Sequence, residues 1–250
     1  MEKIKYNSVV LKFGGSVIPD VDAFGRVADT VKRVQKHYDV RAVVVSAMGK
    51  TTNNLDMTAH QVASSLNKRE LDALLATGEM QSAALLAMRL NAIGVPARSY
   101  NAWQCGIQTD DNFGNAKINH LNLHNINTFY GLPIVTGFQG VTQQGDITTL
   151  GREGSDISAV AIAAALQTDF CWFFKNGGGI SEKYSNKDKI LQQISYTKMQ
   201  QLMRDGRPGH VLHKRSIDMA QKYNVPLYVS GINDFDNGTW ILSRVHAKLH

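Results

Sequence analysis

The chain has 250 residues, of which 43% are hydrophobic and 19% charged, as is typical of a folded soluble protein with a large core. The formal net charge is +6, but the basic residues are spread along the chain instead of forming runs, which argues against a nucleic-acid partner. No apolar run has membrane-spanning length and the N-terminus is not a secretion signal, so we expect a cytoplasmic protein without a membrane partner.

Strand-like apolar runs alternate with helical patterns along the chain. The expected elements are a strand at 7–13, a helix at 21–37, a strand at 41–48, helices at 57–66 and 82–94, strands at 96–100 and 132–138, a helix at 156–166 and a strand at 169–174. Continuous β-branched runs without polar alternation are typical of strands buried on both faces, as in parallel sheets. The pattern therefore predicts an α/β sandwich with helices on both faces of the sheet. Glycine and polar residues near 140–150 form the nearest thing to a seam.

Two cysteines, Cys105 and Cys171, lack the CxxC spacing of a zinc site. We expect both to be reduced and buried as small hydrophobic residues, which fits a cytosolic protein.

Ligands of open α/β sheets bind beyond the carboxyl ends of the strands, so the loops there are of interest. In the first loop Lys12 ends a strand, and Gly14, Gly15 and Ser16 follow. Their N–H groups can approach an anion closely while the lysine supplies charge. An ordinary strand-to-helix turn with a solvated lysine explains the same string.

Two further segments carry polar groups after apolar runs. A dense set of donors follows the strand at 41–48: Ser46, Gly49, Lys50, Thr51, Thr52 and Asn53. In LLATGEM, the carboxylate of Glu79 could pair with a substrate ammonium group. A carboxylate at a helix N-terminus, favoured by the helix dipole, is the alternative.

The string TTLGREGSDISAV is the most informative, because Arg152 stands between glycines just before a helix. Ser155 and Asp156 occupy the place of N-caps. The planar guanidinium suits a carboxylate, and helix N–H groups suit a second anion. Together the loops predict a site for a small zwitterionic carboxylate beside a phosphate donor.

The segment FFKNGGGISEKY, residues 173–184, has three glycines flanked by lysines. It looks built to hold a phosphate, but a flexible hairpin loop has the same composition.

The order of these motifs resembles that of the aspartate kinases of the amino acid kinase family. The resemblance rests on KFGGS, VVSAMGKTTN, ATGEMQSA, SYNAWQCGIQTDDNFGNAKI, GFQGVTQQGDITTLGREGSD, VLHKRSIDMAQKYNVPLYV and GTWI, which span nearly the whole chain. It implies a three-layer αβα sandwich around a mainly parallel sheet, with residues 1–250 forming a single amino acid kinase domain. Its N-terminal lobe, about 1–145, would bind the amino acid, and its C-terminal lobe, about 146–250, the nucleotide.

The resemblance also implies an activity and its residues. ATP would phosphorylate the side-chain carboxylate of L-aspartate to 4-phospho-L-aspartate, with Mg²⁺ held mainly by the nucleotide phosphates and not by protein side chains. Lys12 would stabilise the transferred phosphoryl group and Asp156 would organise the lysines, both in a solvated cleft. The acceptor would be held by Ser46, Thr52, Glu79, Phe138, Arg152 and Ser155. The nucleotide would lie against Lys12, Gly14, Gly15, Ser16, Lys175, Asn176, Gly177 and Lys189.

The nucleotide loop departs from the family. Where the family reads like T-D-V-D-G-V-Y-T-A-D-P-R, Lys175 replaces the threonine, Asn176 the first aspartate and Gly178 the second. Backbone contacts and the extra lysines would compensate for the lost side chains. Pro208 and His210 alter a turn near the nucleotide lobe.

Other departures leave alternatives open. Glu153 replaces a glycine of the GRGGSD string, so a kinase for another amino acid acceptor is one alternative. The altered nucleotide loop leaves a second alternative, a catalytically weak homologue that binds an amino acid or a partner protein. The sequence ends at His250, so we expect no ACT domains and no feedback inhibition through them. A homodimer is left open.

Overall fold

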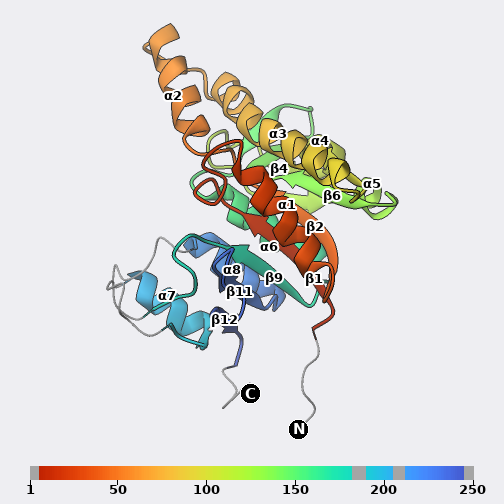
Figure 1. Ribbon diagram of the computed structural model, residues 1–250. Helices are drawn as coiled ribbons and strands as arrows, with labels where there is room; N and C mark the ends of the chain where they lie inside the picture. Colours follow the sequence, from red (N-terminus) through yellow and green to blue (C-terminus); the bar gives the residue numbers. More distant parts are fainter. Residues whose placement is uncertain (1–5, 182–189, 205–211, 245–250) are drawn as a thin grey trace.

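The computed structural model describes residues 6–181, 190–204 and 212–244. Its larger sheet has the strand order β10-β12-β11-β9-β1-β2-β6-β3 (Figure 1). These strands are β1 (Ser8–Phe13), β2 (Asp39–Val45), β3 (Ala97–Tyr100), β6 (Leu132–Thr136), β9 (Phe170–Phe174), β10 (Gln193–Ser195), β11 (Leu227–Ser230) and β12 (Thr239–Leu242). Only β11 and β12 pair antiparallel within it. The predicted mainly parallel sheet is therefore confirmed.

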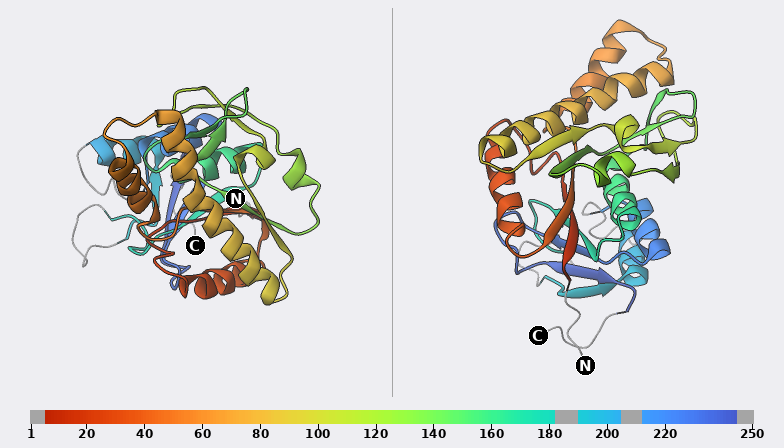
Figure 2. Two further views of the ribbon diagram at one scale, coloured as in Figure 1. Left: turned by 90° about the horizontal axis from the view of Figure 1, so that it is seen from above. Right: turned by 90° about the vertical axis from the view of Figure 1, so that its right-hand side faces the viewer.

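Helices cover both faces of this sheet, as Figure 2 shows. One face carries α1 (Ala23–Val34) and α3 (Lys68–Ala92); the other carries α6 (Gly154–Ala165), α7 (Tyr196–Arg204) and α8 (Lys214–Tyr223). Two separate hydrophobic clusters form beneath them because alternate strand residues point to opposite faces. Val9 and Leu11 pack under α1 and α3, whereas Val10 packs under α6. The predicted three-layer αβα sandwich is confirmed.

A smaller sheet, which the sequence did not predict, has the strand order β5-β4-β7-β8. Its strands are β4 (Ile107–Thr109), β5 (Ile118–Leu121), β7 (Gln139–Val141) and β8 (Ile147–Thr149). Strands of three or four residues are too short to show a clear alternation. The segment 140–150 is a β7–β8 hairpin instead of a seam, and its Asp146 accepts two hydrogen bonds from Arg69 at the start of α3.

The helices between β2 and β3 differ in extent from the prediction. α2 (Thr51–Val62) begins directly after the β2 loop, and α3 begins at Lys68, well before the predicted residue 82. α2 and the first turns of α3 stand out from the rest of the molecule (Figure 1). Gly78 lies within α3, at a position where a Cβ would come within 2.9 Å of the Ala47 Cβ. Glycine therefore lets α3 approach the β2 loop closely.

The short helices α4 (Ala102–Cys105) and α5 (His124–Asn127) complete the fold. Cys105 and Cys171 are free and buried, as predicted. Among the described residues, every helix is too short or too polar to cross a membrane.

Candidate active site

A buried cluster of charges lies where β1, β9 and the start of α6 meet. Lys12 follows Val10 on the α6 side of β1, and its Nζ is 2.5 Å from Oδ1 of Asp156. Lys175, directly after β9, places its Nζ 3.3 Å from the other oxygen, Oδ2. Lys12 is 4% exposed and Asp156 1%. The expectation that these two residues sit in a solvated cleft is therefore wrong: they are buried as an ion cluster.

The charge balance of the cluster depends on Asp156. Burial alone would raise the pKa of Asp156, but the ammonium groups of Lys12 and Lys175 hold it below its usual range. Burial lowers the pKa of Lys175, and the attraction of Asp156 opposes this while Lys12 adds to it. One buried carboxylate thus holds two cations in place.

The start of α6 differs from the prediction that Ser155 or Asp156 caps it. The N-cap is Glu153, which has a φ of 54° and makes no side-chain cap hydrogen bond. Ser155 and Asp156 belong to the first helical turn, and the Asp156 N–H donates to the Glu153 carbonyl at 3.0 Å. As a result the carboxylate of Asp156 is not used as a cap and can bind the lysines.

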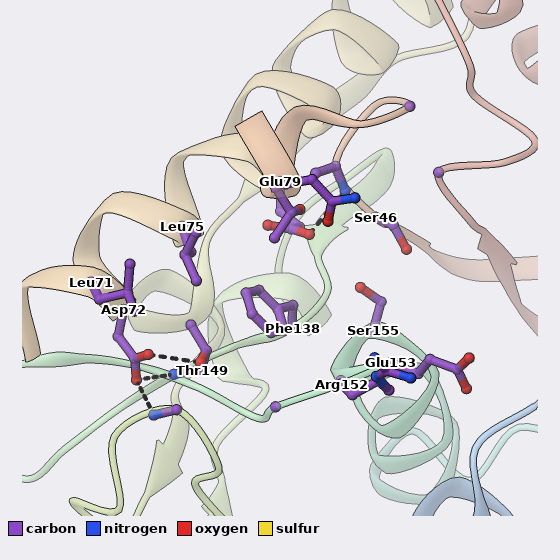
Figure 3. Close-up of a pocket in the computed structure, with 18 residues that line it drawn as sticks. Ser46, Leu71, Asp72, Leu75, Glu79, Phe138, Thr149, Arg152, Glu153 and Ser155 are labelled. Atoms are coloured by element: carbon purple, nitrogen blue, oxygen red, sulfur yellow. Dashed lines mark hydrogen bonds between the residues drawn. The ribbon is translucent and has the colours of Figure 1, made fainter. Parts of the chain in front are cut away.

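A cavity of about 520 Å³ opens beside this cluster (Figure 3). It lies between α3, the N-terminus of α2 and the loops after β1, β2, β6 and β8. All six residues predicted for the acceptor line it: Ser46, Thr52, Glu79, Phe138, Arg152 and Ser155. Gly15 also lines it; a Cβ on Gly15 would lie 2.7 Å from the Ala47 carbonyl oxygen, so only glycine lets the β1 and β2 loops pack this closely.

Glu79 is an incompletely satisfied carboxylate in the wall of this cavity. It is 3% exposed, and its Oε1 accepts the Ala47 N–H at 2.9 Å, while its buried Oε2 has no hydrogen-bond partner among the described residues. Burial raises its pKa to about 7. Glu79 lies in the middle of α3, so the helix-dipole alternative is wrong. A buried unpaired oxygen of this kind needs a donor, and a cationic ligand would supply it.

Arg152 brings the opposite charge to the same cavity. Its side chain is exposed and forms no salt bridge or hydrogen bond with the described residues. Phe138, with a φ of 70°, donates its N–H to Oγ of Ser158 at 3.0 Å, which holds the turn after β6 against α6. The cavity therefore brings together the Arg152 guanidinium and the unpaired Glu79 oxygen, a pair complementary to a zwitterion.

A second cavity, of about 340 Å³, lies on the other side of the cluster. The KNGGG loop lines it through Lys175, Asn176, Gly177, Gly178 and Gly179. Asn176 donates through Nδ2 to the Ser16 carbonyl at 2.6 Å, which ties this loop to the GGS loop. A Cβ on Gly179 would lie 2.5 Å from Cγ2 of Ile190. The triple glycine is thus closely packed at its end and is not merely a flexible hairpin. The predicted Lys189 lies outside the described residues.

Comparison with known proteins establishes the family of this chain. The model of the amino acid kinase family matches residues 7–231. The chain belongs to this family. It is 41% identical over 249 residues to an aspartokinase of Geobacillus stearothermophilus, covering 97% of this chain and 60% of that protein. It is 40% identical over 240 residues to aspartokinase 2 of Bacillus subtilis, covering 93% and 58%. The chain therefore spans about 60% of the length of these curated relatives.

Solved structures agree with the fold. An aspartate kinase from Synechocystis superposes with a TM-score of 0.79 at 35% identity, covering 97% of this chain and 41% of that one. E. coli aspartokinase III in complex with aspartate and ADP gives 0.82 at 23% identity, covering 96% and 65%. The latter match, at low identity, speaks for the fold alone.

Sequence reasoning missed one buried acid in this amino acid kinase domain. Asp72, which lines the first cavity, is 1% exposed and accepts hydrogen bonds from the Gly114 N–H, the Thr149 N–H and the Thr149 hydroxyl. Figure 3 shows these bonds joining α3 to β8 and the loop of Gly114. Burial raises the pKa of Asp72 in spite of them. In the sequence, RELDALL reads as an ordinary polar face of a helix.

The loop after β11 was also missed. Gly231, Asn233, Asp234 and Asn237 line the second cavity opposite the glycines. Because β11 pairs parallel to β9, its carboxyl end lies at the same edge of the sheet. Ligands of such sheets bind beyond the carboxyl ends of the strands, and this principle, which drew attention to the other loops, applies equally to the segment SGINDFDNG.

Proposed function

We propose that the chain is the catalytic domain of an ATP-dependent aspartate kinase, which converts L-aspartate to 4-phospho-L-aspartate. The observation that carries the proposal is that the unpaired Glu79 carboxylate and the free Arg152 guanidinium face one cavity, which adjoins the Lys12–Asp156–Lys175 cluster through Ser155. The names of the relatives, all aspartokinases, support aspartate as the acceptor.

In this proposal the acceptor lies between α3 and the start of α6. Its α-ammonium group donates to Oε2 of Glu79, which otherwise lacks a partner. Its α-carboxylate binds the planar fork of Arg152, an arrangement that lysine could not reproduce. Hydroxyls of Ser46, Thr52 and Ser155 line the same space. The side-chain carboxylate then points toward Lys12.

The donor occupies the second cavity, where the KNGGG and GGS loops are tied together by Asn176. Backbone N–H groups of the glycines, with Gly14, Gly15 and Ser16, approach the phosphates. This proposal assigns acceptor binding to the lobe of about residues 1–145 and the nucleotide to that of about 146–250. Mg²⁺ would be held chiefly by the phosphates, whose charge it neutralises.

The reaction itself needs little covalent chemistry from the protein. An oxygen of the ionised aspartate side chain forms a bond to the γ-phosphorus while the bond from that phosphorus to the bridging oxygen of ADP breaks. A carboxylate nucleophile carries no proton, so no general base is required. Lys12, fixed by Asp156, stabilises the charge on the transferred group.

The test is a coupled ADP-release assay with Mg-ATP and a panel of amino acids, in which hydroxylamine traps the acyl phosphate. Aspartate-dependent hydroxamate is expected, and Lys12→Met serves as the inactive control. Hydroxamate formed with a different amino acid would favour the alternative that the enzyme phosphorylates another acceptor, which the replacement of a glycine by Glu153 in the cavity wall suggested. Aspartate binding by calorimetry without any product would favour the catalytically weak homologue.

We also propose a cytoplasmic location, which the free thiols of Cys105 and Cys171 support. A homodimer stays a prediction, to be tested by light scattering.

A further inference from the structure

Lys175 holds an unusual place at the junction of the two cavities. Its backbone N–H donates to the Ser230 carbonyl at 3.0 Å, which fixes the residue at the end of β9. Its side chain lines the second cavity and reaches Asp156, next to Ser155 in the wall of the first. Among the described residues, its ammonium group makes only this one hydrogen bond of the three that it can donate. Two donors therefore remain for a ligand.

Lys12 and Lys175 bind opposite oxygens of a single carboxylate. Asp156 thereby holds two ammonium groups close together, one from the end of β1 and one from the residue directly after β9. These groups lie between the two cavities, where the proposed transfer would take place. Both cations are placed to contact the transferred phosphoryl group.

Glu153 is the second unusual residue of this region. It keeps a left-handed backbone, with a φ of 54°, at a position where such a conformation favours glycine. Its Oε2 is buried and has no hydrogen-bond partner among the described residues. Figure 3 shows its side chain extending away from Thr149 and Leu75, past Ser155. The cost of this backbone and of the unpaired oxygen calls for a role beyond packing.

The charges around Lys175 connect the two residues. They come from Asp156 on α6, Lys12 on β1, Glu153 before α6 and Asp234 on the loop after β11, which lines the same cavity. Burial and the Lys12 ammonium lower the pKa of Lys175, whereas the carboxylates of Asp156 and Glu153 raise it. Glu153 thus favours the charged form of a lysine that its surroundings disfavour.

We infer that Lys175 is a second cation on the transferred phosphoryl group and that the Glu153 carboxylate is a positioning group that holds the Lys175 ammonium group toward it. This inference rests on the proposed kinase function, whose acceptor it leaves open. It gives the two departures of this chain, the lysine and the glutamate, one shared explanation.

The experiment measures nucleotide binding, which needs neither turnover nor aspartate. Calorimetry compares Mg-ADP with Mg-AMP-PNP, a triphosphate that is not transferred. Lys175→Met is expected to weaken AMP-PNP about tenfold more than ADP, because only the triphosphate carries the group that Lys175 contacts. Lys36→Met, an exposed lysine far from the site, is the control. Equal weakening of both nucleotides, or none, would overturn the role of Lys175; Lys175→Gln replaces the variant if it fails to fold.

The role of Glu153 is tested by the pH dependence of AMP-PNP affinity. Without the glutamate carboxylate the pKa of Lys175 falls, so in Glu153→Gln the loss of affinity at alkaline pH moves to lower pH. Lys175→Arg, which stays protonated, should remove this shift in the double variant. An unmoved profile in Glu153→Gln would refute its role. If aspartate proved not to be the acceptor, these binding results would stand, so the two failures are distinguishable.

Discussion

Replacing Glu79 with glutamine tests the acceptor site and its electrostatic cost together. Glutamine keeps an oxygen for the Ala47 N–H, so the bond at 2.9 Å survives while the charge is lost. The pKa of about 7 in the folded protein lies well above the usual 4.5, so between these values the folded state binds the proton that the unfolded state has released. The contribution of Glu79 to the unfolding free energy is therefore greatest at acid pH and falls as the pH rises toward 7.

The size of this effect follows from the same numbers. A difference of about 2.5 pH units corresponds to about 3 kcal/mol of unfolding free energy lost above pH 7, as an upper figure. Glu79→Gln escapes this loss, so its melting temperature at pH 8 should exceed that of the wild type by about 5 to 10 °C. At pH 4 the two should melt alike.

Although Glu79→Gln should be more stable than the wild type at pH 8, it should bind aspartate more weakly. The ammonium group of aspartate loses a charge-assisted hydrogen bond, which is expected to raise Kd about 10- to 100-fold. Thermal unfolding from pH 4 to 8 and calorimetry with aspartate measure both effects, with Glu70→Gln, an exposed acid of the same helix, as the control. A stability difference that does not vary with pH, or an unchanged Kd, would refute the reasoning.

Four further substitutions separate charge, geometry and packing. Lys12→Met should lower kcat about 100- to 1000-fold with little change in melting temperature, because Asp156 still has Lys175 as its ion-pair partner. Asp156→Asn should lose activity and also about 3 kcal/mol of unfolding free energy, since two lysines then face a neutral amide. Equal melting losses for both variants would contradict this contrast. Arg152→Lys should raise KM for aspartate about tenfold at nearly unchanged kcat, because the bidentate contact is lost, and an unchanged KM would remove Arg152 from the acceptor. In Asp72→Asn the amide N–H groups oppose the donors of Gly114 and Thr149, so urea denaturation should show about 2 kcal/mol less stability; wild-type stability would mean that the amide finds other partners.

The six residues that the resemblance implied for the acceptor line one cavity, and their places in the chain explain why. Ser46, Thr52, Phe138 and Ser155 all follow strands of a parallel sheet or begin the next helix, and the carboxyl ends of such strands share one edge. Arg152 stood out because arginine between glycines serves no purpose in capping.

Residues that act from within helices escaped the same rule. Asp72 and Glu79 both lie within α3, away from any strand end, and charged residues are normally exposed. Glu79 was named from the sequence as a possible partner of an ammonium group, but only packing reveals that it is buried where Gly78 lets α3 approach the β2 loop. Packing also shows that Asp72 is buried against Gly114 and Thr149. The N-cap of α6 was misplaced for a related reason: Glu153 caps through an unusual backbone conformation, and no side-chain pattern records it.

The two cavities differ in the charges that they would offer to the proposed substrates. In the first cavity, the Glu79 carboxylate and the Arg152 guanidinium would bind the ammonium and carboxylate groups of the proposed amino acid. The second cavity, lined by glycines and Lys175, would receive the polyanionic phosphates of the proposed nucleotide beside the buried cluster. Each lysine is paired with Asp156 and has further N–H donors. The phosphates of the proposed nucleotide could therefore bind both ammonium groups while the ion pairs with Asp156 persist. The cluster is therefore organised before the nucleotide arrives, which reduces the reorganisation that transfer requires.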